Sequence, residues 1–240
     1  MSIKAVLFDL DATLLPMNQD EFLQSYFKLL ATRMVRYGYD SKQVIDGIWK
    51  GSHAMIKNDG KRSNEEIFWE AFSKAVGERV LADRYIFDEF YQQEFDNLKE
   101  LCGYNPKAAL IVKKLKEAKL AVVLATNPMF PSLATEKRAA WAGLDISDFN
   151  FYTTYENIGY SKPNPEYYRE IATRLGVLPE ECLMVGNDAS DDMIASTIGM
   201  KVFLHTDCLI NTKNADISQY PQGSFDQLDE YIRLQAPSYS

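Results

Sequence analysis

Hydrophobic positions along the chain follow two different periods. The run Ala5–Phe8 is continuously apolar, which is typical of a strand buried on both faces of a parallel sheet. From about residue 19 to residue 101, apolar residues recur at helical spacing, and no strand-like run interrupts them. From Asn105 onward, short apolar runs alternate with helical segments. The pattern predicts a doubly wound, mostly parallel α/β sheet with an all-helical unit inserted after its first strand.

Helix-capping residues define the boundaries of the predicted helices. Asn105 and Pro106 are typical of a helix start, Ser63 and Glu66 have the spacing of a capping box, and Gly77 is placed to end a helix. We expect a Rossmann-like core domain from residues 1–15 and 102–240 and a helical cap domain from residues 16–101. The expected cap helices span residues 19–37, 41–57, 63–77 and 79–101; the expected core strands span 121–125, 151–153, 183–185 and 202–204, and the core helices 106–118, 133–141, 165–175, 190–198 and 225–234.

Polar side chains follow the predicted strands. Asp9 and Asp11 come directly after the first strand. The carboxyl ends of parallel strands share one edge of the sheet, and ligands bind at that edge. Two carboxylates so close repel each other unless a cation lies between them. The other polar groups expected at this edge are Thr126 and Asn127 after strand 121–125, Lys162 in the loop before helix 165–175, and Asp188, Asp191 and Asp192 after strand 183–185.

These groups together match the needs of a phosphoryl site. Several carboxylates, one ammonium and one hydroxyl can bind Mg²⁺ and a phosphoryl group at the same time. Taken singly, Lys162 is more simply a solvated loop lysine, Thr126 a helix N-cap, and the acids after residue 187 a favourable first helical turn. Their joint occurrence at successive strand ends favours the phosphoryl-transfer interpretation.

Four segments carry a resemblance to a known family. FDLDATLL, LATN, SKPNP and VGNDASDD, in this order and spacing, resemble the four motifs of the haloacid dehalogenase (HAD) superfamily of phosphohydrolases. The resemblance covers the core from Ala5 to about Leu204. The helical insertion resembles the type-one cap of that superfamily in position and class only.

The resemblance implies a role for each matching residue. Asp9 would be the nucleophile that forms an aspartyl-phosphate, and Asp11 would be first the acid and then the base. Thr126, with Asn127, would hold phosphoryl oxygens, and Lys162 would offset developing negative charge. The implied cofactor is Mg²⁺, with ligands from Asp9, Asp11 (through its carbonyl), Asp188 and Asp192.

The match has two departures from the usual pattern. Ala12 stands where the family commonly has glycine, and its extra methyl group is tolerable if φ there is negative. The spacing from Asp188 favours Asp192 as the second acid of the fourth motif, with Asp191 as the alternative. Dehalogenase members lack the second aspartate of the first motif, so Asp11 favours phosphate chemistry.

The cap should determine substrate specificity, because it can close over the edge of the sheet and exclude water. Lys57, Lys61 and Arg62 flank a predicted turn and are candidates for binding an anionic substrate; the alternative is that they are simply solvated. Trp49 and Trp69 are more simply expected in the core.

Composition limits the partners. The formal charge of −8 and the pI near 4.9 argue against nucleic acid or an anionic membrane as the main partner. No apolar run reaches the length of a membrane span, and the start of the chain lacks a signal-peptide pattern. We expect a cytoplasmic protein, as a monomer or homodimer.

The predicted function is Mg²⁺-dependent hydrolysis of a small phosphorylated metabolite. One alternative is a phosphomutase of the same superfamily, which would return the phosphoryl group to a sugar. Another is a catalytically idle protein that binds a phosphometabolite or a protein partner as a sensor. The joint presence of Asp9, Asp11, Thr126, Lys162 and Asp188 speaks against the idle protein.

Overall fold

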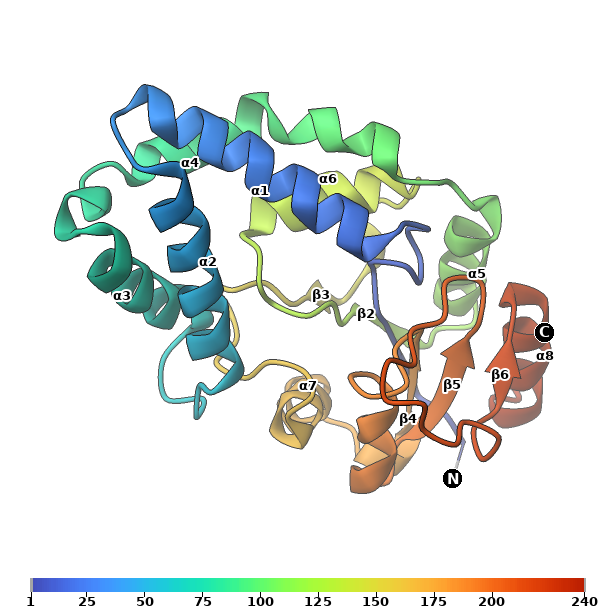
Figure 1. Cartoon of the computed structure of the whole chain (residues 1–240). Coiled ribbons are helices and arrows are strands. Elements are labelled where there is room, and N and C mark those ends of the chain that lie inside the picture. The colour runs from blue at the N-terminus through green and yellow to red at the C-terminus, as the bar shows by residue number, and fades with distance from the viewer. Residues whose placement is uncertain (1, 240) are drawn as a thin grey trace.

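The computed structural model describes residues 2–239 (Figure 1). None of the helices in this range has the length and apolar character needed to cross a membrane. The strands are β1 (Ala5–Phe8), β2 (Ala121–Leu124), β3 (Phe151–Tyr152), β4 (Cys182–Gly186), β5 (Lys201–His205) and β6 (Gln222–Gly223). The α-helices are α1 (Gln19–Arg36), α2 (Ser41–Ile56), α3 (Asn64–Val76), α4 (Arg84–Gln93), α5 (Pro106–Glu117), α6 (Ser132–Trp141), α7 (Pro165–Leu175) and α8 (Phe225–Gln235); the 3₁₀ helices are η1 (Glu78–Leu81), η2 (Phe95–Leu101), η3 (Ile146–Asp148), η4 (Pro179–Glu181) and η5 (Met193–Ile198).

The sheet confirms the predicted fold class. Its six strands are parallel and run in the order β3-β2-β1-β4-β5-β6. Phe8 at the end of β1 pairs with Leu124 of β2 and with Val185 of β4. The three central strands therefore end at the same level, and the loops that follow them meet at one edge of the sheet.

Strand β1 is buried on both faces, as its continuous apolar run predicts. Val6 and Phe8 belong to the hydrophobic core that includes α5, α6 and α8. Ala5 and Leu7 point the other way, into a separate core formed with α7 and η5. Alternate side chains of a strand face opposite sides of the sheet, so a strand covered on both sides needs apolar residues at every position.

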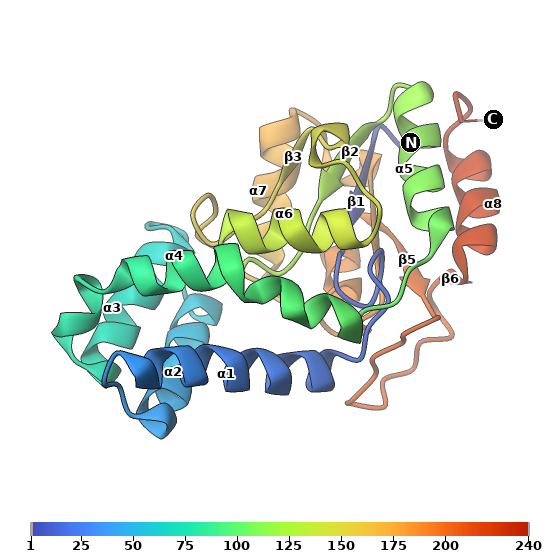
Figure 2. The same ribbon diagram turned by 90° about the horizontal axis from the view of Figure 1, so that it is seen from above.

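The helices from α1 to α4 form an insertion between β1 and α5 that extends away from the sheet (Figure 2). Its two ends meet, because Met17 and Cys102 form an antiparallel bridge and the Gly103 N–H donates to the Pro16 carbonyl at 2.7 Å. This closed base supports our proposal that residues 16–101 act as a cap. Within the insertion, Gly47 and Gly51 allow α2 and α3 to pack closely: a Cβ at Gly51 would lie 2.4 Å from the Phe68 ring.

Three element predictions were wrong. The single helix expected over 79–101 is broken into η1, α4 and η2; in η2 the tighter 3₁₀ turn aligns Phe95 and Leu98, three residues apart, on the buried side. The helix expected over 190–198 is the 3₁₀ helix η5, because the Asp188 carboxylate accepts hydrogen bonds from the N–H groups of Ser190 and Asp191 and forms a turn there. The two-residue strand β6 was missed.

Ala12 also differs from expectation, because its φ is +61°. The tight turn after Asp11 closes with hydrogen bonds from the Ala12 N–H to the Leu15 carbonyl and from the Leu15 N–H to the Leu10 carbonyl, both 2.8 Å. A left-handed conformation costs an alanine about 1–2 kcal/mol. Burial of its methyl group stabilises the folded protein by about 0.8 kcal/mol relative to glycine. The lower freedom of alanine in the unfolded chain adds about 0.4–1 kcal/mol. These terms nearly cancel, which explains why alanine is tolerated.

We therefore predict that Ala12→Gly leaves the free energy of unfolding within about 0.5 kcal/mol of wild type, because the lost methyl burial and the greater freedom of glycine in the unfolded chain together offset the relief of strain. Lys119→Gly is the matched control: its φ is also +61°, but its side chain is exposed, so only strain relief and unfolded-chain entropy remain. It should raise the free energy of unfolding by about 0.5–1 kcal/mol. Urea denaturation measures both. Equal stabilisation by the two glycine substitutions would contradict the proposed offset between strain and methyl burial at Ala12.

Candidate active site

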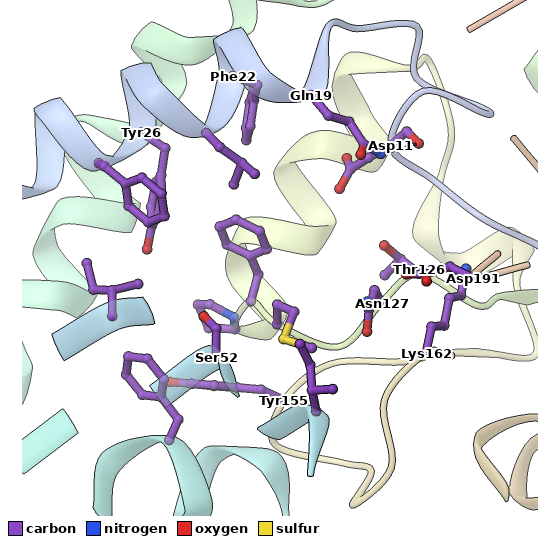
Figure 3. Close-up of a pocket in the computed structure, with 18 of the residues that line it drawn as sticks. Asp11, Gln19, Phe22, Tyr26, Ser52, Thr126, Asn127, Tyr155, Lys162 and Asp191 are labelled. Carbon is purple, nitrogen blue, oxygen red and sulfur yellow. Dashed lines mark hydrogen bonds between the residues drawn. The ribbon is translucent and has the colours of Figure 1, made fainter. Parts of the chain in front are cut away.

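The edge of the sheet brings the predicted polar groups to one pocket of about 270 Å³. Asp9 follows β1, Thr126 follows β2, and Asp188 follows β4, while Lys162 reaches in from the loop before α7. Figure 3 shows Thr126, Asn127, Lys162 and Asp191 close together at one end of the pocket. Of the predicted site residues, the pocket is lined by Asp9, Asp11, Thr126, Asn127, Lys162, Asp188 and Asp192, and Asp191 lines it as well.

Lys162 forms the centre of a buried ion cluster. Its Nζ lies 2.7 Å from Asp9 Oδ1 and 2.6 Å from Asp192 Oδ1, and only 2% of its side chain is exposed. Burial alone would lower the pKa of the ammonium, but the Asp192 and Asp9 carboxylates outweigh burial and hold that pKa well above its usual value. Lys162 is therefore a permanent positive charge at the floor of the pocket.

Asp9 is fixed from both sides. One carboxylate oxygen accepts from Lys162, and the other lies 3.2 Å from the Thr13 hydroxyl, which also lies 3.0 Å from Asn187 Oδ1. Burial raises the pKa of Asp9 to about 7, and the Lys162 charge opposes that rise. Thr13 was not singled out from the sequence, although it lies within the FDLDATLL segment. Its hydroxyl orients the carboxylate that faces the pocket.

Hydrogen bonds to the backbone carbonyl of Thr126 fix the position of this residue. Its carbonyl accepts hydrogen bonds from the Thr153 hydroxyl at 2.7 Å and from the Tyr167 hydroxyl at 2.8 Å. The next side chain, Asn127, has a buried Oδ1 with no hydrogen-bond partner within the described part of the chain. A fixed backbone with polar side chains directed to the pocket is suited to binding an oxygen-rich ligand (Figure 3).

Asp192, rather than Asp191, is the partner of Lys162. Its second oxygen accepts from the Asp188 N–H at 3.0 Å, so both Asp192 oxygens are engaged within the protein. Gly186 leaves room for it, since a Cβ there would lie 2.1 Å from Asp192 Oδ2. Asp191 lines the pocket, and burial followed by the neighbouring Asp188 charge raises its pKa to about 6. Asp192 thus orients Lys162 and the Asp188 loop.

Arg138 is a site residue that was missed from the sequence. It comes from α6, has no exposed surface, and forms an ion pair with Asp11. Its guanidinium lies 4.4 Å from the centre of the Phe130 ring, and its Nε donates to the Ala134 carbonyl at 3.2 Å. The available signal was its spacing: Arg138 is four residues after Ala134 and three before Trp141, on the apolar face of the helix. A buried arginine requires a carboxylate partner.

The oxygen donors at the charged end of the pocket, around Asp9 and Lys162, fit a hard cation such as Mg²⁺. Five aspartates line this end against two contacting cations, and the buried Oδ1 of Asp11 has no hydrogen-bond partner. Within residues 2–239, no group of three or more acidic, histidine or cysteine side chains is arranged to hold a metal ion by itself. Mg²⁺ commonly takes one or two carboxylates and completes its shell with water and phosphate oxygens. Asp9, Asp11 and Asp188 are the residues that would hold it.

The structure does not bring the three basic cap residues to the pocket. Lys57, Lys61 and Arg62 are exposed and do not line it. Lys61 pairs with the neighbouring Asp59 at 2.6 Å, and Arg62 pairs with Glu70 at 2.7 Å. The expectation that they bind an anionic substrate is therefore corrected, because all three side chains are exposed to solvent outside the pocket lining.

That turn instead connects the insertion to the Lys162 loop. Asn64 has no exposed surface and donates from Nδ2 to Ser161 Oγ at 3.0 Å and to the Tyr160 carbonyl at 3.2 Å. Asn58 Nδ2 donates to Asn64 Oδ1 at 2.9 Å. Ser161 directly precedes Lys162, so this buried network ties the helical insertion to the residue that carries the site's central charge.

Comparisons with known proteins identify the family of this chain. The family model described as haloacid dehalogenase-like hydrolase matches residues 3–196. Glyceraldehyde 3-phosphate phosphatase of Methanopyrus kandleri is 27% identical over 196 residues, covering 80% of this chain and 78% of that protein. Phosphoglycolate phosphatase of Salmonella typhimurium is 26% identical over 210 residues, covering 82% and 79%. The crystal structure of a predicted phosphoglycolate phosphatase from Haemophilus somnus has a TM-score of 0.59 at 16% identity, covering 96% of this chain and 98% of that chain; this likeness shows the fold alone.

We predict that Arg138→Met lowers the free energy of unfolding by about 3 kcal/mol, because it leaves the Asp11 carboxylate without its counter-charge. Arg233→Met is the matched control. Arg233 also pairs with an aspartate, Asp229, but its side chain is half exposed, so its loss should cost less than about 1 kcal/mol. Guanidinium denaturation followed by circular dichroism compares the two. Similar losses for both variants would show that the buried Arg138–Asp11 pair contributes no more to the free energy of unfolding than a half-exposed pair does.

Proposed function

The chain belongs to the haloacid dehalogenase-like hydrolases, and we propose that it is a phosphatase that cleaves a small phosphomonoester through an aspartyl-phosphate on Asp9. The observation that carries this proposal is the fixed Asp9 carboxylate at the pocket floor. It is held by Lys162 and Thr13, with a second carboxylate, Asp11, two residues along. Phosphoryl transfer depends mainly on positioning and charge neutralisation, and this arrangement provides both.

Asp9 attacks phosphorus, and the alcohol leaves as the new acyl-phosphate bond forms. Lys162, held between Asp9 and Asp192, offsets negative charge on the transferring group. The Thr126 hydroxyl and the Asn127 side-chain N–H donate to phosphoryl oxygens, and both residues line the pocket. These roles use residues from three different loops: strand register places the loops after β1 and β2 side by side, and ion pairs with Asp9 and Asp192 hold Lys162.

Asp11 is the proposed acid and base. It protonates the leaving alcohol oxygen and then removes a proton from the water that hydrolyses the aspartyl-phosphate. Arg138 and the Gln19 side chain, which donates to the Asp11 carbonyl at 3.2 Å, hold this residue in place. Arg138 does not line the pocket, so we assign it a positioning role.

Mg²⁺ is the proposed cofactor, held by Asp9, Asp11 and Asp188. When bound, it would neutralise the repulsion between the Asp9 carboxylate and the substrate phosphate. Asp192 was also expected among the ligands, but its engagement with Lys162 and the Asp188 N–H favours an orienting role. The names of the two curated relatives, both phosphatases, support the reaction class for this chain.

We predict that Asp9→Asn lowers Mg²⁺-dependent turnover of p-nitrophenyl phosphate by at least about 10³-fold, because the nucleophile is lost. Asp226→Asn, an exposed aspartate on α8 that pairs with Lys107, is the control and should keep wild-type turnover. Circular dichroism of both variants checks that they are folded. Substantial activity of folded Asp9→Asn would exclude Asp9 as the nucleophile.

Asp11→Asn should separate the two chemical steps. The p-nitrophenolate group leaves without protonation, so the variant should still form the aspartyl-phosphate, but hydrolysis of that intermediate lacks its base. We predict a burst of about one p-nitrophenolate per enzyme in rapid-mixing experiments, followed by a slow steady rate. Slow product formation without a burst would place the main role of Asp11 before or during the first step.

A further inference from the structure

The pocket has two ends of opposite character. Its catalytic end is charged, whereas the other end is lined by apolar and aromatic side chains, most of them from the helical insertion. Figure 3 shows this division, with Lys162 and Asp191 on one side and Phe22, Tyr26 and Tyr155 on the other. A leaving group bound to a phosphoryl group at Asp9 would extend into this apolar end.

Helix α2 contributes an apolar face that the protein itself does not cover. Trp49 was expected in the core, and this was wrong. Val44 and Met55 are buried, whereas Trp49 is 45% exposed and Ile56 is 42% exposed. Trp49, Ser52 and Ile56 all line the pocket, three and four residues apart. The helix thus has a second apolar face, directed at the pocket.

Packing against helix α1 holds this apolar face of α2 in place. Phe27 of α1 packs against Trp49, with ring centres 5.1 Å apart, and both rings line the pocket. Two aromatic rings held together at a cavity wall leave a stable apolar surface that a ligand can cover. Ser52 lies on the same face and supplies one hydroxyl group among the apolar side chains.

The pocket offers no counter-charge for an acidic leaving group. Among the described residues that line it, Lys162 is the only basic one, and its ammonium is already shared by Asp9 and Asp192. The insertion contributes an acidic residue, Asp88, to the lining and no lysine or arginine. A carboxylate or a second phosphate at this end would lose its hydration without gaining a cation.

We propose that the substrate is a phosphomonoester of an uncharged alcohol with a bulky apolar or aromatic group. This inference rests on the proposed phosphatase function and adds the class of leaving group. It separates this chain from the substrate named for the Salmonella relative, since phosphoglycolate carries a carboxylate beside its phosphate. The phosphate binds at the Asp9 and Lys162 end, and the apolar group covers Trp49, Phe27 and Ile56.

The test compares three primary alkyl esters, 2-phenylethyl phosphate, ethyl phosphate and phosphoglycolate, because their scissile P–O bonds have similar intrinsic reactivity. With Mg²⁺, kcat/KM for 2-phenylethyl phosphate should exceed that for ethyl phosphate by about tenfold or more, and phosphoglycolate should be the poorest substrate. A preference for phosphoglycolate would overturn the inference and leave the phosphatase function intact. Hydrolysis of none of these esters or of p-nitrophenyl phosphate above the Asp9→Asn level would overturn the function itself.

Substitutions at Trp49 and Ile56 test whether the pocket determines the substrate preference. Trp49→Ala should lower the ratio of kcat/KM for 2-phenylethyl phosphate over ethyl phosphate by about tenfold. Tyr85→Ala is the matched control: Tyr85 is an aromatic residue of the same insertion, 49% exposed and outside the pocket lining, and its loss should leave the ratio unchanged. Ile56→Arg should raise kcat/KM for phosphoglycolate relative to ethyl phosphate. An unchanged ratio in Trp49→Ala, or no gain for phosphoglycolate in Ile56→Arg, would contradict the assignment.

Discussion

The structure depends on one buried ammonium group. Lys162 reaches from the loop before α7 to carboxylates that follow β1 and β4, and all three side chains are almost completely buried. A buried charge is tolerated only when its partners are close and well oriented, so this cluster fixes three loops relative to one another. The Asn58–Asn64–Ser161 network extends the same constraint to the helical insertion. The geometry of the charged cluster and the position of the helical insertion therefore depend on the same short loop.

The catalytic end was predictable because it follows from local patterns and sheet geometry. Strand ends can be recognised from short apolar runs, and parallel strands place the residues after them at one edge. Asp9, Thr126, Lys162 and Asp188 were found in this way. Arg138 was not found in this way, because its partner Asp11 is 127 positions away and the sequence around Arg138 does not indicate that contact.

The helical insertion was less predictable for a different reason. Helical spacing shows which residues are apolar, but it does not show whether an apolar face meets another helix or a cavity. Trp49 and Val44 have similar apolar character, yet one lines a pocket and the other is buried. The glycines of α2 carry part of the missing information, since Gly47 and Gly51 mark the face that approaches α3 and leave the Trp49 face for the pocket.

The two ends of the pocket also act on each other. The attraction between Lys162 and a bound phosphoryl group would strengthen when water is excluded from the pocket, because the effective dielectric constant falls. A ligand that covered Trp49 and Phe27 would displace water from the apolar end of the pocket. A small polar leaving group would leave it hydrated, whereas a bulky apolar one would dry the space beside the charged cluster. For the substrate class proposed above, the apolar end would thus link substrate size to the electrostatic strength of the charged end.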